Sequence, residues 1–349
     1  MSNPIFINGR FLTQRMTGIQ RFSYELCKML IELGTEITIL APRKILPEYH
    51  LNCRIVQFGM FNNILWEQTD LRLYLLRHKN PLLINFGSPG PVFYSNRIVT
   101  IHDLSFLVHP SWFSKSYYLY YRWVTPIFIR RSKKVITVSE FSKQEILRLT
   151  GISENKIEII YNAVSADLNG QHGANDVSRQ PYILSVASLD PRKNTVRLVE
   201  AFKLSGLDAK YNLMLVGKKD TIFNMQIPDE ILANCVGYVS DEELAALYKN
   251  ASLFVYPSIY EGFGIPPLEA MSLGCPVILS DIPVFREIFG DAACYADPGE
   301  TESISDAMVH VLTHDDYRQQ LCEHGAERAK QYSWERSARK LLAIINSLA

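Results

Sequence analysis

Short apolar runs rich in β-branched residues alternate with amphipathic, helix-like segments along nearly the whole chain. The runs span residues 4–8, 37–41, 82–86, 98–103 and 135–139 in the first half, and 182–189, 212–217, 253–258 and 276–281 in the second. Strands that are apolar along their whole length are typical of parallel sheets, because helices cover both faces of such sheets. The alternation therefore predicts an α/β protein with doubly wound parallel sheets.

The length of the chain and one polar segment divide it into two domains. At 349 residues, the chain is longer than a typical single domain. Residues 166–181 are rich in Gly, Asn and Asp and show no hydrophobic periodicity, as expected of a linker. We therefore expect a Rossmann-like domain over residues 1–165, a second one over 182–333 and an amphipathic helix over 334–349. Ligands are expected at the carboxyl ends of the strands and in the cleft between the domains.

Composition excludes several classes of protein. The chain is 47% hydrophobic and 21% charged, which is ordinary for a soluble globular protein. Its cysteines are scattered without metal-ligand spacing, which favours reduced thiols in the cytoplasm. The start of the chain lacks the apolar core of a signal peptide, and no apolar run approaches the roughly 20 residues of a membrane-spanning helix. We expect a cytoplasmic protein that is at most peripheral at the inner face of the membrane.

The charge of the chain is unevenly distributed. Residues 1–165 carry 20 Lys and Arg against 11 Asp and Glu, a net charge of +9, whereas residues 166–349 carry 16 against 25, a net charge of −9. Either the two domains simply differ, or the basic half faces an anionic membrane or a diphosphate-linked acceptor. Residues 113–134 mix aromatic and basic residues at helical spacing. They fit an interfacial membrane helix or a helix packed on its own domain.

Residues 257–281 (PSIYEGFGIPPLEAMSLGCPVILSD) have the features of an anion-binding site. Glu261 precedes a Gly-Phe-Gly turn, prolines 266–267 mark the start of a helix, and Gly274 marks its end. The free N–H groups at a helix start bind phosphate or carboxylate oxygens. Because Glu269 follows in the same helix, two carboxylates flank the anion site, and the segment predicts a nucleotide-sugar site.

The stretch EGFGIPPLEA, followed by GCPVILSD, resembles the signature of the family 4 retaining glycosyltransferases, which have the GT-B fold. Further stretches agree with that family in the expected order: MTGIQRF, TIHDL, TVSEFSK, IIYNAV, VASLDPRKN, LVGKK and VGYVSDEELAALYKNA. The resemblance implies two Rossmann-like domains that face each other across a cleft. It implies that the N-terminal domain binds the acceptor, that the C-terminal domain binds the nucleotide-sugar donor and that the last helix crosses back to the N-terminal domain. It also implies a transfer that retains the anomeric configuration and needs no cofactor or active-site metal.

The resemblance also implies roles for residues of the second domain. Glu261 is expected to contact hydroxyl groups of the donor sugar, and Glu269 to accept hydrogen bonds from both ribose hydroxyls, as a carboxylate can. The donor-binding turn between them is formed by Gly262, Phe263, Gly264 and Ile265. Its glycines let the backbone approach a ligand closely.

Basic residues after one strand suit the diphosphate of the donor. Arg192 and Lys193 follow the run at 182–189, and their charges would stabilise a leaving diphosphate as the glycosidic bond breaks. Arg192 could instead be a surface charge. Ser188 stands about where the family often has a further basic residue, so one phosphate contact is weaker here or supplied differently.

Four further residues match less specific family segments. Gly18 resembles the first glycine-rich loop, and Tyr238 with Val239 matches the segment that lines the pocket for the nucleotide base. Tyr238 could also be a core residue. His102 ends the run at 98–103 and either hydrogen-bonds the donor sugar or is a buried histidine bonded to the backbone. It is not needed as a base, because in a front-side retaining transfer the leaving phosphate takes the acceptor proton.

We therefore expect a retaining glycosyltransferase that moves a hexose from a nucleotide-sugar to a lipid-linked or oligosaccharide acceptor in O-antigen or capsule-type polysaccharide biosynthesis. The IHDL and PRKN segments favour mannose from GDP-mannose, and a UDP-hexose donor is the alternative. More distant alternatives are a GT-B-fold sugar-nucleotide epimerase and a non-catalytic nucleotide-sugar binding protein. No G-x-G-x-x-G follows a predicted strand, which excludes a dinucleotide oxidoreductase. No nucleic acid partner is expected.

Overall fold

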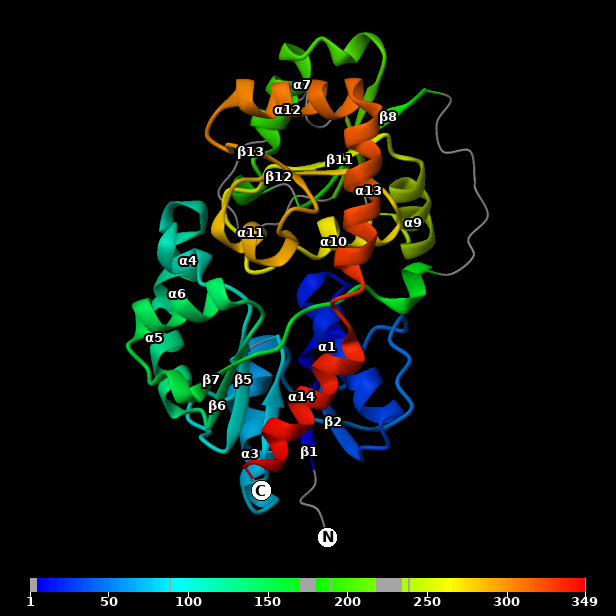
Figure 1. Ribbon diagram of the computed structural model, residues 1–349. Helices are drawn as coiled ribbons and strands as arrows, with labels where there is room; N and C mark the ends of the chain where they lie inside the picture. The colour runs from blue at the N-terminus through cyan, green and yellow to red at the C-terminus, as the bar shows by residue number, and fades with distance from the viewer. Residues whose placement is uncertain are drawn as a thin grey trace. The chain divides into compact units, whose positions relative to one another are not determined.

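The computed structural model describes residues 5–87, 89–169, 180–188, 190–217, 234–237 and 239–348, which form two compact α/β units (Figure 1). The first unit consists of Met1–Leu107, Leu119–Asn162 and Trp334–Ala349, and the second of Val108–Tyr118 and Ala163–Ser333.

The unit boundaries differ in two places from the expected domains. The segment Val108–Tyr118, expected in the first domain, groups with the second unit, where the ring of His109 meets the ring of Tyr260 edge-on at 5.8 Å. The second difference is at Asn162, where the chain passes from the first unit to the second, three residues before the expected domain end at residue 165. The start of the expected linker, Ala166–Asn169, forms a 3-10 turn, and most of the remainder lies outside the described residues.

The first unit is built on a parallel sheet of seven strands in the order β3-β2-β1-β4-β5-β6-β7. Its strands are β1 (Ile5–Asn8), β2 (Ile37–Ala41), β3 (Arg54–Gln57), β4 (Leu83–Asn85), β5 (Arg97–Ile101), β6 (Lys134–Thr137) and β7 (Ile157–Ile159). From β1 the strand order runs in one direction to β2 and β3 and in the other to β4 and beyond. The two neighbours β1 and β4 therefore form the topological switch point of this sheet.

Helices cover the first sheet. They are α1 (Gly18–Glu32), α2 (Asn63–Trp66), α3 (Arg72–Arg77), α4 (Ser105–Val108), α5 (Lys115–Arg131), α6 (Glu140–Thr150) and α14 (Trp334–Asn346), and a π turn (Glu67–Leu71) joins α2 to α3. The last helix, α14, packs against α1, where the rings of Trp334 and Phe22 meet edge-on at 5.9 Å. The Ser337 hydroxyl of α14 donates a hydrogen bond of 2.7 Å to the carbonyl of Tyr161. These contacts make α14 part of the first unit.

The second unit contains a parallel sheet of six strands in the order β10-β9-β8-β11-β12-β13. Its strands are β8 (Tyr182–Val186), β9 (Asn212–Val216), β10 (Cys235–Gly237), β11 (Leu253–Tyr256), β12 (Val277–Ser280) and β13 (Cys294–Ala296). Its helices are α7 (Thr195–Leu204), α9 (Asp241–Asn250), α10 (Ile265–Ser272), α11 (Pro283–Phe289), α12 (Thr301–Thr313) and α13 (Asp315–Ala329). Here β8 and β11 form the switch point.

The two parallel sheets with their helices confirm the predicted fold class. Each predicted apolar run overlaps a strand, and all of these strands lie in the interior of their sheets. The strands that were not predicted are the edges of the two sheets: β3, β7, β10 and β13. Edge strands are partly exposed; in β3, for example, no residue is fully buried. Their sequences therefore lack the continuous apolar run that marks an interior strand.

Among the described residues, none of the helices combines the length and the apolar character that a membrane span requires.

Candidate donor site in the second unit

The predicted donor residues gather at the switch point of the second sheet. The loop after β8 carries Arg192 and Lys193, and the loop after the neighbouring strand β11 carries Glu261. A backbone hydrogen bond of 2.7 Å from the Ile259 N–H to the Arg192 carbonyl ties the two loops together. Parallel sheets bind their ligands at this place because two loops separate there and leave a crevice.

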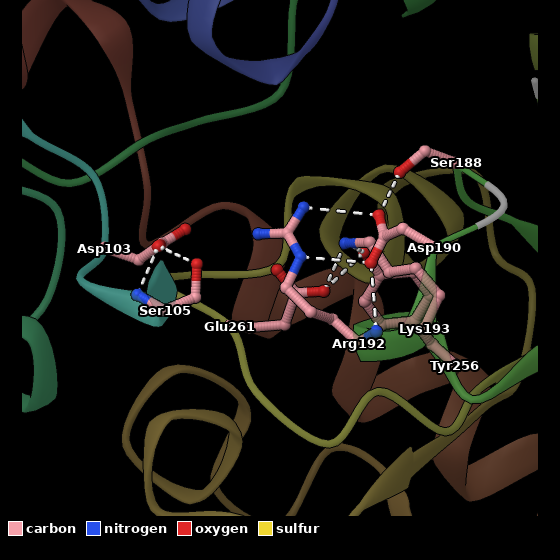
Figure 2. A network of polar contacts seen from close by, with 8 residues as sticks. All are labelled: Asp103, Ser105, Ser188, Asp190, Arg192, Lys193, Tyr256 and Glu261. Carbon is pink, nitrogen blue, oxygen red and sulfur yellow. Dashed lines mark hydrogen bonds and ion pairs between the residues drawn. The ribbon is translucent and has the colours of Figure 1, made fainter. Parts of the chain in front are cut away.

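Lys193, Glu261 and Tyr256 form a buried triangle of polar contacts (Figure 2). The Lys193 ammonium donates to Oε1 of Glu261 and to the Tyr256 hydroxyl, the latter at 2.8 Å. The Tyr256 hydroxyl donates to the same carboxylate oxygen at 3.0 Å. The side chains of Lys193 and Glu261 are each only 10% exposed, so water screens this ion pair little.

The triangle fixes the charges of its members. Burial disfavours the ammonium of Lys193, but the Glu261 carboxylate outweighs this effect, so the pKa of Lys193 is raised. Burial, with the same carboxylate, also raises the pKa of Tyr256. At neutral pH, Lys193 is therefore a cation and Tyr256 a neutral hydrogen-bond donor. Tyr256 could not be singled out from the sequence, because its position at the end of an apolar strand is also that of a core residue.

Asp190 organises the loop that carries the two cations. It is completely buried and accepts hydrogen bonds from the backbone N–H and the Nε of Arg192, both at 3.0 Å (Figure 2). The Ser188 hydroxyl donates to the other carboxylate oxygen at 2.6 Å. Burial disfavours the carboxylate, but Arg192 and Lys193 outweigh it and lower the pKa of Asp190. Asp190 was also missed, although its place before Pro191 is a common helix-capping position.

Glu269 lies on α10, beyond the turn that follows Glu261. It is 5% exposed and accepts a hydrogen bond of 3.1 Å from the hydroxyl of Tyr248 on α9. Burial, together with this carboxylate, raises the pKa of Tyr248, which therefore stays a neutral donor. The carboxylate is thus held in place by a neighbouring helix, and hydrogen bonding to a ribose stays a prediction.

The turn between the two glutamates leads directly into α10. Gly264 has φ of 103°, a conformation that favours glycine, and a Cβ there would come within 3.0 Å of the Phe285 ring. Phe263 is 3% exposed and packs edge-on against Tyr332 at 5.5 Å, so only its backbone can serve a ligand. Ile265 begins the helix.

The remaining predicted site residues lie elsewhere. Gly18 is the exposed first residue of α1, and His102 follows β5, so both belong to the first unit. The Nε2 of His102 donates to the Phe86 carbonyl at 2.9 Å, and burial lowers the pKa of the ring, which is therefore neutral at pH 7. Val239 lies between β10 and α9, and Tyr238 lies outside the described residues.

A second buried polar cluster, not predicted from the sequence, occupies the switch point of the first sheet. Asn8 ends β1 and Asn85 ends β4, and the amide of Asn8 donates to Oδ1 of Asn85 at 2.9 Å. The same amide donates to Glu67 at 2.7 Å. Glu67 is 1% exposed and pairs with the guanidinium of Arg10 at 2.9 Å. The first unit thus also carries fixed hydrogen-bonding groups where a parallel sheet binds ligands.

The described residues were also compared with the requirements of a metal site. Within the ranges that the structure describes, no cluster of three or more His, Cys, Asp or Glu side chains could hold a metal ion. The expectation that the reaction needs no active-site metal stays a prediction.

Sequence comparisons relate both units to known enzymes. The profile of the family "Glycosyl transferases group 1" matches residues 171–328, and that of "Glycosyltransferase Family 4" matches residues 16–168. The O-antigen chain mannosyltransferase B of Escherichia coli is 34% identical over 267 residues, which cover 70% of this chain and 70% of that protein. The O-antigen chain mannosyltransferase RfbU of Salmonella typhimurium is 35% identical over 222 residues, or 62% of this chain and 61% of that protein.

Solved structures share the fold at low sequence identity. WaaG, a glycosyltransferase involved in lipopolysaccharide biosynthesis, has a TM-score of 0.74 at 16% identity, with 98% of this chain and 99% of that chain covered. Anabaena Alr3699/HepE, solved in complex with UDP-glucose, has a TM-score of 0.77 at 16% identity, with 99% and 100% covered.

Proposed function

Because the chain belongs to the family 4 glycosyltransferases, we propose that it transfers a hexose from a nucleotide-sugar to a lipid-linked or oligosaccharide acceptor, with retention of the anomeric configuration. Two of its relatives are named O-antigen chain mannosyltransferases, and this supports hexosyl transfer in polysaccharide biosynthesis. The observation that carries the proposal is the buried pair of Lys193 and Glu261 at the carboxyl ends of β8 and β11.

The pair suits two neighbouring parts of a nucleotide-sugar, the diphosphate and the sugar. The Lys193 ammonium, with Arg192 beside it, is placed for the diphosphate, where its hydrogen bonds strengthen as negative charge grows on the leaving oxygen. The Glu261 carboxylate can accept hydrogen bonds from sugar hydroxyls, and Glu269 from the ribose. The charge of Lys193 is already balanced by Glu261, which keeps the site stable before the donor binds.

The proposed transfer makes the following bond changes. The bond between the anomeric carbon and the diphosphate oxygen breaks, and the acceptor oxygen bonds to the same face of that carbon. The acceptor proton passes to the departing phosphate oxygen, so the protein supplies no base. Lys193 and Arg192 stabilise the charge that develops on the diphosphate. The neutral His102, bonded to the Phe86 carbonyl, is suited to hydrogen bonding and not to ion pairing.

GDP-mannose is the favoured donor, because relatives that are 34% and 35% identical to this chain are named O-antigen chain mannosyltransferases. A UDP-hexose is the second candidate, because a structural neighbour was solved with UDP-glucose. We place the acceptor at the first unit, where Asn8, Glu67 and Arg10 supply fixed polar groups at the switch point. No cofactor is proposed besides the donor, and no active-site metal.

A transfer assay tests the proposal. Purified protein is incubated with membranes and either GDP-mannose or UDP-glucose, each labelled in the sugar, and label is measured in the lipid-extractable and polymer fractions. We expect incorporation from one donor in the presence of EDTA, and its loss in Glu261→Gln. Glu302→Gln is the matched control, because it makes the same change at an exposed glutamate of the second unit. No incorporation from either donor, or full activity of Glu261→Gln, would refute the assignment.

A further inference from the structure

A buried carboxylate, that of Asp190, lies beside the place proposed for the donor diphosphate. Asp190 is completely buried and precedes the 3-10 turn Pro191–Lys193, which carries both cations of the donor site. A carboxylate at this place repels a diphosphate and also loses its hydration on burial. Aspartate is almost never buried completely unless it is paired, so its partners indicate what it does.

Asp190 holds the guanidinium of Arg192 along one edge. Its Oδ1 accepts a hydrogen bond from Nε of Arg192 at 3.0 Å, and its Oδ2 accepts one from Nη2 at 3.3 Å. Two bonds of this kind fix both the position and the plane of a guanidinium. The third nitrogen of Arg192, Nη1, points away from Asp190 (Figure 2).

The carboxylate of Asp190 is itself fixed by further bonds. The Ser188 hydroxyl donates to Oδ2 at 2.6 Å, and the backbone N–H of Arg192 donates to Oδ1 at 3.0 Å. The carbonyl of Arg192 accepts the hydrogen bond from Ile259 that joins the loops after β8 and β11. The guanidinium is therefore anchored to the same two loops that bring Lys193 and Glu261 together.

Two effects of Asp190 on an anionic ligand have opposite signs. Its negative charge weakens the binding of a diphosphate. In contrast, its bonds order the side chain of Arg192 in advance, so that little rotamer entropy is lost when a ligand binds. Arg192 is 16% exposed, and without Asp190 it could turn toward solvent. The ligand would then lose charge-assisted hydrogen bonds as well as the nearby positive charge, so ordering is the larger effect.

We propose that Asp190 is a positioning residue of the donor site, which directs the guanidinium of Arg192 at the donor diphosphate without touching the donor itself. This inference rests on the proposed function and deepens it, because it assigns the residue that makes Arg192 a binding residue and not a surface charge.

Calorimetric titration of GDP and UDP into the full chain in EDTA tests the proposal. The proteins are the unchanged chain, Asp190→Asn, Arg192→Ala and the double variant. Asn keeps the shape of the side chain and one acceptor oxygen, but it removes the charge. We expect Asp190→Asn to bind the nucleotide roughly tenfold more weakly, although a negative charge near an anion is lost. In the Arg192→Ala background, the same substitution should leave the affinity unchanged or strengthen it.

This reversal distinguishes positioning from two simpler roles. If Asp190 acted only through its charge, Asp190→Asn would strengthen binding in both backgrounds. If it only shaped the loop, Asp190→Asn would weaken binding in both. Either result overturns the proposal. Arg192→Lys tests it with Asp190 intact, because lysine keeps the charge but lacks the planar edge. We expect a loss of roughly tenfold, and an unchanged affinity of Arg192→Lys would also overturn the proposal.

Asp315→Asn is the matched control, because it makes the same change in an exposed pair of the second unit. Asp315 lies 2.8 Å from Arg318, and its side chain is 83% exposed. It should bind nucleotide as the unchanged chain does, and circular dichroism confirms that each variant is folded. Weaker binding in Lys193→Ala but not in Asp190→Asn would overturn this inference and leave the proposed function standing. No nucleotide binding by the unchanged chain would overturn both.

Discussion

Replacing Lys193 with methionine isolates the energetics of the buried ion pair. Lys193→Met keeps a side chain of similar length but leaves the Glu261 carboxylate, whose side chain is 10% exposed, without its cation. Removal of one partner from a buried ion pair costs about 3–5 kcal/mol of the free energy of unfolding, and solvent screening reduces this little at such low exposure. The hydrogen bond from the Tyr256 hydroxyl remains, so we expect the lower end of the range.

A double-mutant cycle adds a second substitution, which removes the negative charge that Lys193→Met leaves without a partner. Glu261→Gln in the Lys193→Met background keeps the shape of the side chain and accepts a hydrogen bond from Tyr256. Since replacing both members of a buried pair is often close to neutral, the double variant should recover most of the loss.

Calorimetry and urea denaturation of the full chain measure the cycle. A loss of about 3 kcal/mol corresponds to a fall of roughly 6–12 °C in the melting temperature for a unit of this size. Lys210→Met is the control, because Lys210 is exposed beside the Tyr211 ring and should change the free energy of unfolding by less than about 1 kcal/mol. Equal losses in Lys193→Met and Lys210→Met, or additive losses in the double variant, would refute the reasoning.

Three further predictions concern single side chains. Tyr256→Phe keeps the ring but removes the hydroxyl shared by the ion pair, and should lower the free energy of unfolding by about 1.5–3 kcal/mol in urea; no change would contradict the triangle. Glu269→Ala should abolish the preference for GDP over 2′-deoxy-GDP in calorimetric titrations, and an unchanged preference would exclude the ribose contact. Burial lowers the pKa of His102, so its contribution to stability is present above the unfolded pKa of about 6.5 and is lost as pH falls through the lower folded pKa. The melting temperature of the unchanged chain should therefore fall more between pH 7.5 and pH 5.5 (roughly one pH unit either side of that value) than that of His102→Gln, and parallel curves would contradict this.

The interior of both sheets was predictable, whereas their edges were not. Interior strands such as β11, whose residues Leu253–Tyr256 are all buried, need largely apolar side chains and so leave a continuous signal in the sequence. An edge strand such as β3 is half exposed, so its sequence RIVQ resembles many loops. The division between the units was harder still, because the grouping of Val108–Tyr118 with the second unit depends on contacts between distant residues.

Those donor-site residues were predictable whose own side-chain type, within a short motif, suits a part of the donor. Lys193 and Glu261 stand out because their types suit a diphosphate and a sugar, and the structure places them in contact. The hydroxyl of Tyr256 contacts both of them, and the carboxylate of Asp190 holds the neighbouring Arg192, through side-chain geometry that the sequence does not reveal. Lys193 and Glu261 are 68 positions apart, and no periodicity connects residues at that separation. The position of Tyr256 between these two residues likewise depends on the fold.

Nucleoside diphosphate binding tests the central claim most directly. GDP and UDP are titrated calorimetrically into the unchanged chain, Lys193→Ala and Lys210→Ala, all in EDTA. We expect one nucleotide to bind the unchanged chain and Lys210→Ala equally, and Lys193→Ala about 10–100-fold more weakly, as the loss of a charged hydrogen bond to phosphate predicts. Equal affinities of all three proteins, or no binding of either nucleotide, would contradict a donor site at the carboxyl ends of β8 and β11.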